Sequence, residues 1–198
     1  MKQKTYESEL PAGYQKAYYL NAKDKKVGIL FNLIALVIMI AVLAVGVLPL
    51  INTERTREEI SETALMLFPL GLLLVMLIYI VSHELVHGIF MRLFSKMRVK
   101  YGFTALYAYA GSDAYFDKSS YIIIALAPVA VWGAVLALVC ALVPPLWFWP
   151  LYIIQINNFA GAAGDFYVTA RFACLPRDIL VRDTGTAMTV FAKSTETV

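Results

Sequence analysis

The chain has 198 residues, of which 60% are hydrophobic, and its formal net charge is +3. This composition is too apolar for an ordinary soluble domain of that length, and it indicates an integral membrane protein. The small net charge says little about nucleic acid, and we expect no nucleic-acid partner.

Four long and mostly apolar segments predict transmembrane helices, because a helix of about 20 apolar residues crosses the hydrocarbon layer of a bilayer. These segments cover residues 27–51, 64–94, 119–143 and 146–170. The first segment does not have the features of a cleaved signal peptide, since its uncharged run is too long and no small-residue cleavage site follows it. A polar arm, residues 1–26, precedes it.

The basic residues predict how the chain is oriented in the membrane. Fifteen of the seventeen Lys and Arg residues lie in the arm, in the segment 92–118 or in the tail from residue 171 onward. The positive-inside rule then places both termini in the cytoplasm, in a multi-pass protein of the cell membrane. Cys140 falls near the outer end of the third span and Cys174 on the cytoplasmic side, so we expect no disulfide between them.

Two segments outside the spans have the composition of strands. Residues 97–117 are rich in Tyr, Phe and Val, which favours a β-hairpin or a re-entrant loop at the cytoplasmic interface. An aromatic interface belt without strands is the alternative. The tail over residues 178–192 predicts a short hairpin around Asp183-Thr184-Gly185. Together these features predict an all-α membrane protein with four transmembrane helices, both termini inside, and one domain over residues 1–198.

Residues 83–87 form the motif H-E-x-x-H within the second span, and its histidines are the only two in the chain. On a helix, His83 and His87 share one face, so both imidazoles can bind one metal ion. Glu84 is about 100° further round the helix, close enough to reach a metal-bound water. Zinc makes such a water acidic, and a carboxylate can then take its proton. The alternative, two buried histidines without a metal, is costly at a membrane boundary.

A catalytic zinc ion requires a third protein ligand. Glu84 and Asp165 are the acidic residues that fall inside the predicted spans. His83 and Asp165 each lie nineteen residues into a span that runs inward, which places both about 28 Å from the outer surface. Asp165 is therefore the leading candidate for the third ligand, although it could instead be a single acid at the interface. Asp113, on the 97–117 segment, is the rival ligand.

Asn158 and Gly161 share a helical stripe with Asp165. Gly161 and Gly164 would let the fourth span approach the second closely, and Gly88 suggests similar close packing. Asn158 could donate a hydrogen bond to a substrate backbone or to an oxyanion, as a catalytic residue. The alternative is that this asparagine only joins helices.

Asp183-Thr184-Gly185 spells the triplet of aspartic proteases. That chemistry requires two carboxylates that share a proton, and the chain has no second copy of the triplet. A turn is the better interpretation of these three residues.

The stretches "HELVHGIF", "VKYGF", "GAAGDFYV" and "VRDTG" resemble a bacterial family of small membrane proteins known as putative zincin peptidases, a domain-of-unknown-function family. The resemblance covers most of residues 75–190. The layout is also similar to the site-2 protease class of intramembrane metalloproteases, which place H-E-x-x-H on one span and an aspartate on a later one. This resemblance implies His83, His87 and Asp165 as zinc ligands and Glu84 as the general base.

The chain departs from the site-2 protease pattern in two respects. In that class a glycine usually follows the aspartate, whereas here Gly164 precedes Asp165 and Phe166 follows it. In addition, no proline follows Asp165 within the fourth span. The similarity to that class is therefore architectural, and its substrates do not carry over to this chain.

These features predict a zinc-dependent membrane endopeptidase that hydrolyses peptide bonds in membrane or membrane-proximal substrates by a metal-bound water that Glu84 activates. We expect Zn²⁺ as the cofactor, a peptide or membrane protein as the substrate, and the lipid bilayer as the surroundings. A substrate strand would pair with the main chain of residues 97–117. The first alternative is a metal-binding membrane protein without catalysis, a sensor or a carrier. The second is a structural or partner-regulating protein without metal. The oligomeric state stays open.

Overall fold

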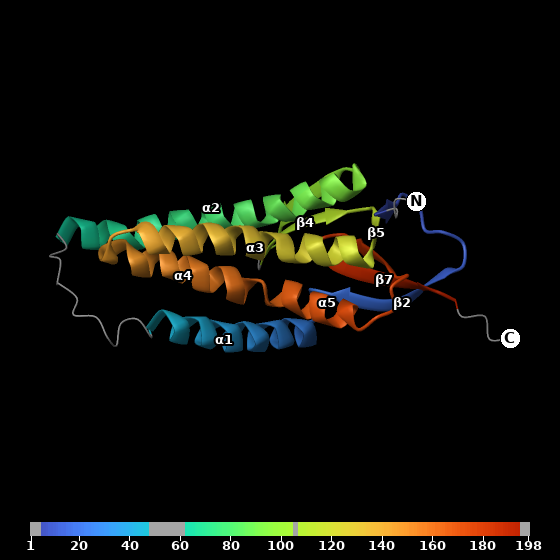
Figure 1. Ribbon diagram of the computed structural model, residues 1–198, viewed down its shortest axis with the longest axis horizontal. Coiled ribbons are helices and arrows are strands. Elements are labelled where there is room, and N and C mark those ends of the chain that lie inside the picture. Colours follow the sequence, from blue (N-terminus) through green and yellow to red (C-terminus); the bar gives the residue numbers. More distant parts are fainter. Residues whose placement is uncertain (1–4, 48–61, 105–106, 195–198) are drawn as a thin grey trace. The chain divides into compact units, whose positions relative to one another are not determined.

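The computed structural model describes residues 5–47, 62–104 and 107–194. Its helices are α1 (Lys25–Val47), α2 (Glu62–Ser95), α3 (Lys118–Leu142), α4 (Pro145–Gly161) and α5 (Ala163–Ala173). Its strands are β1 (Tyr6–Glu7), β2 (Tyr14–Asn21), β3 (Val99–Phe103), β4 (Ala108–Ser112), β5 (Tyr115–Asp117), β6 (Leu180–Asp183) and β7 (Ala187–Lys193). Figure 1 shows these elements along the chain.

The chain divides into two compact units. We call one the sheet unit; it comprises residues 1–31, 84–128 and 164–198. We call the other the helical unit; it comprises residues 32–83 and 129–163. The division falls inside α1, α2 and α3, so each of these helices contributes turns to both units, and it also falls after the first residue of α5.

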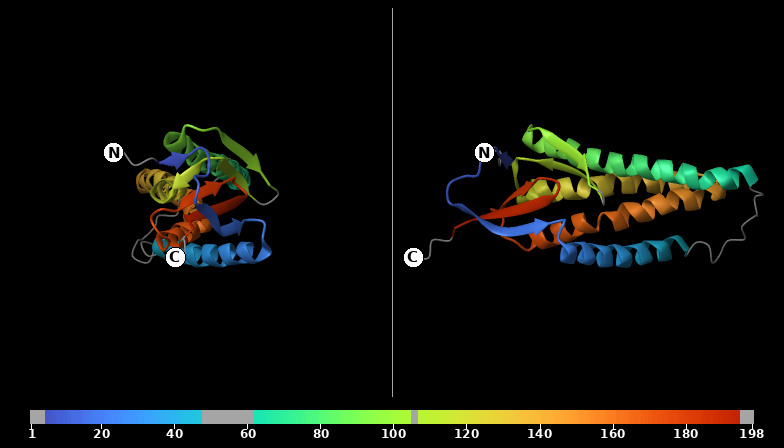
Figure 2. Two further views of the ribbon diagram at one scale, coloured as in Figure 1. Left: turned by 90° about the vertical axis from the view of Figure 1, so that its right-hand side faces the viewer. Right: turned by 180° about the vertical axis from the view of Figure 1, so that it is seen from behind.

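The main sheet of the sheet unit has the strand order β1-β5-β6-β7-β2, and every neighbouring pair is antiparallel. β6 and β7 form the hairpin that the tail sequence predicts, and Asp183 pairs with Met188 at its closed end. β2 lies beside β7, so the N-terminal segment and the C-terminal segment are neighbours (Figures 1 and 2).

A second, two-stranded sheet comes from residues that were predicted to form a hairpin or a re-entrant loop. β3 and β4 pair antiparallel from Val99↔Ser112 to Phe103↔Ala108, which confirms the hairpin. The chain then turns at Asp113 and Ala114, and β5 joins the main sheet instead of continuing the hairpin.

The predicted all-α fold class is wrong, because the protein is a mixed α and β structure. The polar arm 1–26, for which no strand was predicted, supplies β1 and β2. β2 reads Y-Q-K-A-Y-Y-L-N, which has weak alternation, and β1 has two residues. Strands of this kind gain their stability from partners far along the chain, and local patterns do not report such partners.

The prediction of a fourth transmembrane helix over residues 146–170 is also wrong. α4 is 17 residues long and ends at Gly161, and a new helix, α5, starts at Ala163. Three helical segments of the described chain are long and apolar enough to cross a membrane: Lys25–Val47, Phe68–Ser95 and Lys118–Leu142. Closely spaced glycines at Gly161 and Gly164 weaken a continuous helix at this point.

Several topological expectations remain predictions. The membrane orientation of the two termini and the single domain over residues 1–198 are among them. Most of the predicted outer loop, residues 52–63, lies outside the described residues.

Each unit has a core of its own. In the sheet unit, aromatic and branched side chains of β5, α3, α5, β6 and β7 pack together, and Phe116, Phe172 and Val181 are completely buried. In the helical unit the core forms around Tyr79, Leu136 and Ile154. This core is small because most apolar side chains of the helical unit's α1 segment are exposed, with Val37 at 68%. Such exposure is consistent with membrane association.

Candidate metal centre

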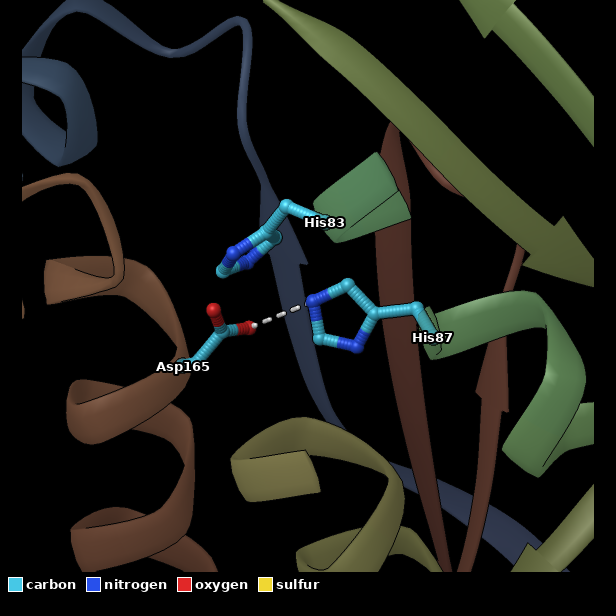
Figure 3. A group of neighbouring side chains, drawn as sticks. All are labelled: His83, His87 and Asp165. Atoms are coloured by element: carbon cyan, nitrogen blue, oxygen red, sulfur yellow. Dashed lines mark ion pairs between the residues drawn. The ribbon is translucent and has the colours of Figure 1, made fainter. Parts of the chain in front are cut away.

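His83 and His87 lie one turn apart on α2, which is continuous from Glu62 to Ser95. Nδ1 of His87 is 2.9 Å from the carbonyl oxygen of Ile124 on α3. A carbonyl oxygen only accepts hydrogen bonds, so Nδ1 of His87 carries the proton and donates it. In the neutral ring the lone pair is then on Nε2, which points toward Asp165 (Figure 3).

The ring of His83 is oriented by a tyrosine. Nδ1 of His83 is 2.9 Å from the hydroxyl oxygen of Tyr79, one turn earlier on α2. That hydroxyl donates its own proton to Oδ1 of Asn158, 3.0 Å away. Tyr79 therefore accepts from Nδ1 of His83, and the lone pair of this ring also lies on Nε2.

Asn158 is completely buried within the helical unit. Its Oδ1 accepts from Tyr79 and its Nδ2 donates to the carbonyl oxygen of Val129, 3.3 Å away. Both ends of the amide thus join α4 to its neighbours α2 and α3. These bonds favour the helix-joining alternative over the predicted role toward an oxyanion, which stays a prediction.

Asp165 lies in the first turn of α5, because the chain breaks after α4 and begins a new helix. The N-terminus of a helix carries partial positive charge, which stabilises a carboxylate in the first turn. Oδ1 of Asp165 lies 3.6 Å from Nε2 of His87. One ligand atom each of His83, His87 and Asp165 all lie within 4.8 Å of one another (Figure 3).

The donor atoms of this group are suited to zinc. Two neutral imidazoles with Nδ1 engaged and Nε2 carrying the lone pair, together with one carboxylate, are a ligand set that catalytic zinc sites use. Each histidine has a polar partner that holds the ring, and the His87 and Asp165 side chains are only 11% and 20% exposed. We define His83, His87 and Asp165 as the ligand group.

Glu84, the predicted general base, faces the β3–β4 hairpin. The backbone N–H of Ala110 in β4 faces its carboxylate. The hairpin is also seated on α2 by Tyr101, whose ring and hydroxyl occupy the space beside Gly88. Gly88 is one turn after Glu84, so the hairpin covers the face of α2 that carries the base.

Asp113, the rival ligand, is not a member of the ligand group. Its carboxylate accepts hydrogen bonds from Nζ of Lys100 at 2.6 Å and from Nη2 of Arg182 at 2.7 Å. These two hydrogen bonds, the one from Lys100 foremost, hold the pKa of Asp113 below its ordinary value. Asp113 thus ties β3 to β6 across the two sheets.

The predicted contact of Gly161 and Gly164 with the second span has no counterpart in the described neighbours. The side chain nearest to the missing Cβ of Gly164 is Phe31 of α1, and for Gly161 it is Asn157 of α4 itself. The Asp183-Thr184-Gly185 triplet forms the predicted turn, in which Gly185 has a φ of 84°. Asp183 is buried, and burial raises the pKa of its carboxyl.

The sequence interpretation overlooked three groups that contact the site: Tyr79, the Ile124 carbonyl and the Ala110 amide. Tyr79 precedes His83 by four residues, so the i, i+4, i+8 stripe of Tyr79, His83 and His87 contained a usable signal. The other two groups belong to the main chain, and no side-chain pattern reports them.

Residues 75–180 of the chain match the model of one protein family, whose description is Putative zincin peptidase. The matched range contains all three members of the ligand group and Glu84. No curated protein and no solved structure matches the chain.

Proposed function

Since this chain belongs to the Putative zincin peptidase family, we propose that it is a zinc-dependent membrane endopeptidase that cleaves membrane or membrane-proximal polypeptides. The family description indicates a zinc metallopeptidase, and the three apolar helices indicate association with a membrane. The observation that carries the proposal is the ligand group, in which donor atoms from α2 and α5 lie within 4.8 Å of one another.

In this proposal His83, His87 and Asp165 hold the zinc ion. When bound, zinc supplies Lewis-acid chemistry, because it makes a water molecule acidic near neutral pH and polarises a peptide carbonyl. The chain prepares the ligands: Tyr79 and the Ile124 carbonyl hold the Nδ1 atoms of the two histidines, and the start of α5 stabilises the Asp165 carboxylate. We propose that the centre is organised like that of the site-2 protease class, with ligands on two separate helices.

Glu84 acts as general base in the proposed reaction. Its carboxylate takes a proton from the attacking water and later gives it to the amine of the leaving peptide. The Ala110 N–H orients one side of this carboxylate. Asn158 has no assigned step in this reaction, because its amide is hydrogen-bonded to the Tyr79 hydroxyl and to the Val129 carbonyl.

We further propose that the substrate binds as an added strand on the edge of β3. Thr104 N–H donates to the Tyr107 carbonyl, so Thr104 and Tyr107 form a hydrogen-bonded pair of the ladder. In an antiparallel ladder, hydrogen-bonded pairs alternate with pairs that are not hydrogen-bonded. Phe103↔Ala108 and Tyr101↔Ala110 are therefore pairs without hydrogen bonds between their two residues. The contact of Ala110 N–H with Glu84 agrees with this assignment.

It follows that the main-chain groups of Tyr101 and Phe103 point away from β4, toward the outer edge of β3. Among the described strands, β4 is the one neighbour of β3. An extended peptide on that edge would lie on the side of the hairpin opposite the Ala110 amide that faces Glu84, about 10 Å from β4, so the hairpin would hold the polypeptide near the site and the scissile bond would belong to a segment beyond the paired residues. Phe103→Pro removes an outward N–H and should slow cleavage, whereas Phe103→Ala keeps that N–H and should not. Equal rates for the two variants would contradict the strand-addition proposal.

The proposed activity is tested by zinc content and by turnover on the same purified protein. Wild-type protein in detergent should hold one zinc ion per chain, and His83→Ala and Asp165→Ala should each lose it. Glu84→Gln should keep the zinc ion but cleave a peptide library on the order of 10²- to 10⁴-fold more slowly, because the proton acceptor is lost.

Two other results would point to other functions. If Glu84→Gln kept full biological function with its zinc bound, the protein would be a metal sensor or carrier. If wild-type protein were zinc-free and did not take up added zinc, the metallopeptidase proposal would be wrong.

A further inference from the structure

Pro128 lies within α3, which continues on both sides of it from Lys118 to Leu142. A proline in a helix has no N–H, so it cannot donate to the carbonyl oxygen four residues earlier. Its ring also pushes that carbonyl outward, away from the helix axis. In α3 the residue four positions before Pro128 is Ile124.

The carbonyl oxygen of Ile124 is the atom that accepts the proton on Nδ1 of His87, at 2.9 Å. The sequence thus removes the usual helical donor at the one carbonyl of α3 that a histidine of the ligand group uses. Pro128 is completely buried, and Ile124 is 1% exposed, so water does not replace the missing donor. Both residues and His87 belong to the sheet unit.

The consequence concerns the tautomer of His87. If residue 128 carried an N–H, that group and His87 would compete for one carbonyl oxygen. A weaker bond at Nδ1 would let the imidazole proton move to Nε2, which is the nitrogen 3.6 Å from Asp165. A protonated Nε2 cannot coordinate a metal ion, so the competition would weaken the ligand group.

We propose that Pro128 is a positioning residue of the metal centre, which reserves the Ile124 carbonyl for His87 and thereby keeps the His87 lone pair on Nε2. The inference rests on the proposed function insofar as it concerns zinc. The tautomer of His87 can be measured in the metal-free protein, and that part of the inference does not depend on zinc.

The first test compares Pro128→Ala with wild-type protein. Alanine restores the N–H and favours the helix, so α3 should stay folded. Zinc affinity, measured by competition with a chromophoric chelator, should fall on the order of 10-fold, the lower end of what loss of a ligand's supporting hydrogen bond costs. Pro150→Ala is the matched control, because it also removes a proline from a helix interior, in α4, and should leave zinc affinity unchanged.

The second test reads the tautomer directly in metal-free protein. The chain contains two histidines, so ¹⁵N spectra of the imidazoles have few signals, and a His83→Gln variant assigns them. At a pH where the rings are neutral, His87 of wild-type protein should show the Nδ1-protonated tautomer. Pro128→Ala should show a mixture of both tautomers, a change that a general loss of stability does not produce.

A third variant covers the case in which Pro128→Ala does not fold. Replacing Ala125 by the corresponding α-hydroxy acid turns the Ile124 carbonyl into an ester carbonyl, a weaker acceptor, while Pro128 remains. This variant should show the same tautomer mixture and the same loss of zinc affinity.

The outcomes separate this inference from the proposed function. If wild-type protein binds zinc and the changes at positions 128 and 125 alter neither the affinity nor the tautomer, the inference is wrong and the function stands. If wild-type protein takes up no zinc, the function is wrong, and the ¹⁵N spectra alone decide on Pro128.

Discussion

Single residues prepare the two histidines in different ways. His83 is oriented by a side chain, the Tyr79 hydroxyl, and His87 by a main-chain carbonyl, that of Ile124. Both partners engage Nδ1, so each ring directs Nε2 toward a metal. The motif alone places the imidazoles on one helical face, but it does not determine which nitrogen carries the proton.

Tyr79→Phe should weaken zinc binding on the order of 10-fold, because His83 loses the acceptor that keeps its proton on Nδ1. The ring packing against Trp132, with centroids 5.9 Å apart, remains. Loss of the buried hydroxyl should also lower the free energy of unfolding by about 1–3 kcal/mol. The measurements are chelator competition and chemical denaturation.

The control for this variant is Tyr19→Phe, whose residue is 48% exposed on β2 and should change neither quantity. Unchanged zinc affinity in a folded Tyr79→Phe protein would contradict the role assigned to the hydroxyl.

Asp113 predicts a pH dependence of stability. Hydrogen bonds from Lys100 and Arg182 lower its pKa, so the ionised form stabilises the fold above the ordinary aspartate pKa of about 4, and this contribution disappears as the pH falls through the lowered value. Asp113→Asn should therefore lower the melting temperature at neutral pH, and the difference from wild type should shrink in acid. Because the side chain is 43% exposed, solvent screening keeps the effect modest.

Thermal melts of both proteins between neutral pH and about pH 3 measure this difference. Asp178→Asn is the comparison, since Asp178 is 53% exposed and its contact with Lys193 is 3.8 Å long. A difference between Asp113→Asn and wild type that grew toward acid would contradict the assigned sign.

At the scale of elements, the β3–β4 hairpin depends on small residues where it meets its neighbours. Tyr101 occupies the space beside Gly88 on α2, and the backbone of Gly111 approaches the turn at Thr184 and Gly185. A Cβ at either glycine would meet these groups at less than ordinary contact distance. The hairpin thus sits against α2 on one side and the β6–β7 turn on the other.

Gly88→Ala should displace the hairpin, because the added methyl group meets the Tyr101 ring and hydroxyl. Overpacking of this kind costs about 1–3 kcal/mol. Amide hydrogen exchange in β3 should become faster, and cleavage should slow because the Ala110 amide moves away from Glu84. Combining Gly88→Ala with Tyr101→Ala should restore stability by removing the clash.

Gly71→Ala is the matched control on the same helix, since a Cβ there meets nothing within 4 Å. If Gly88→Ala changed neither hydrogen exchange nor activity, the seating of the hairpin by Tyr101 would be refuted.

At the scale of the whole molecule, the break between α4 and α5 has the largest consequence for the site. A continuous span over residues 146–170 would place Asp165 in a helix interior, where its neighbours are neutral peptide groups. The break places it in the first turn of a new helix, beside amide groups that stabilise its charge. The three remaining apolar helices suit a membrane protein.

The predicted orientation in the membrane is tested through Cys174, which is exposed. In a Cys140→Ser background, a membrane-impermeant maleimide should label Cys174 in inside-out vesicles and not in intact cells, because the tail is predicted to be cytoplasmic. Labelling in intact cells would reverse the predicted orientation. A Cys174→Ser variant in the same background measures unspecific labelling.

The sequence alone was sufficient for the parts that depend on local periodicity. The i, i+4 spacing of His83 and His87, the long apolar helices and the tail hairpin all follow from patterns within about 30 neighbouring residues. The pairing of Asp165 with the motif was predicted by counting residues from the span starts, although the fourth span on which that count relied is not one helix.

Only the tertiary structure decided the rest, because the deciding contacts join residues far apart in the chain. β2 pairs with β7 across most of the sequence, and among the described strands β7 is the one neighbour of β2. The proton positions on the histidines depend on Tyr79 and on a carbonyl of α3 that Pro128 leaves without its usual donor. Side-chain patterns encode which face a residue occupies, whereas main-chain hydrogen bonds between elements arise only when the elements pack.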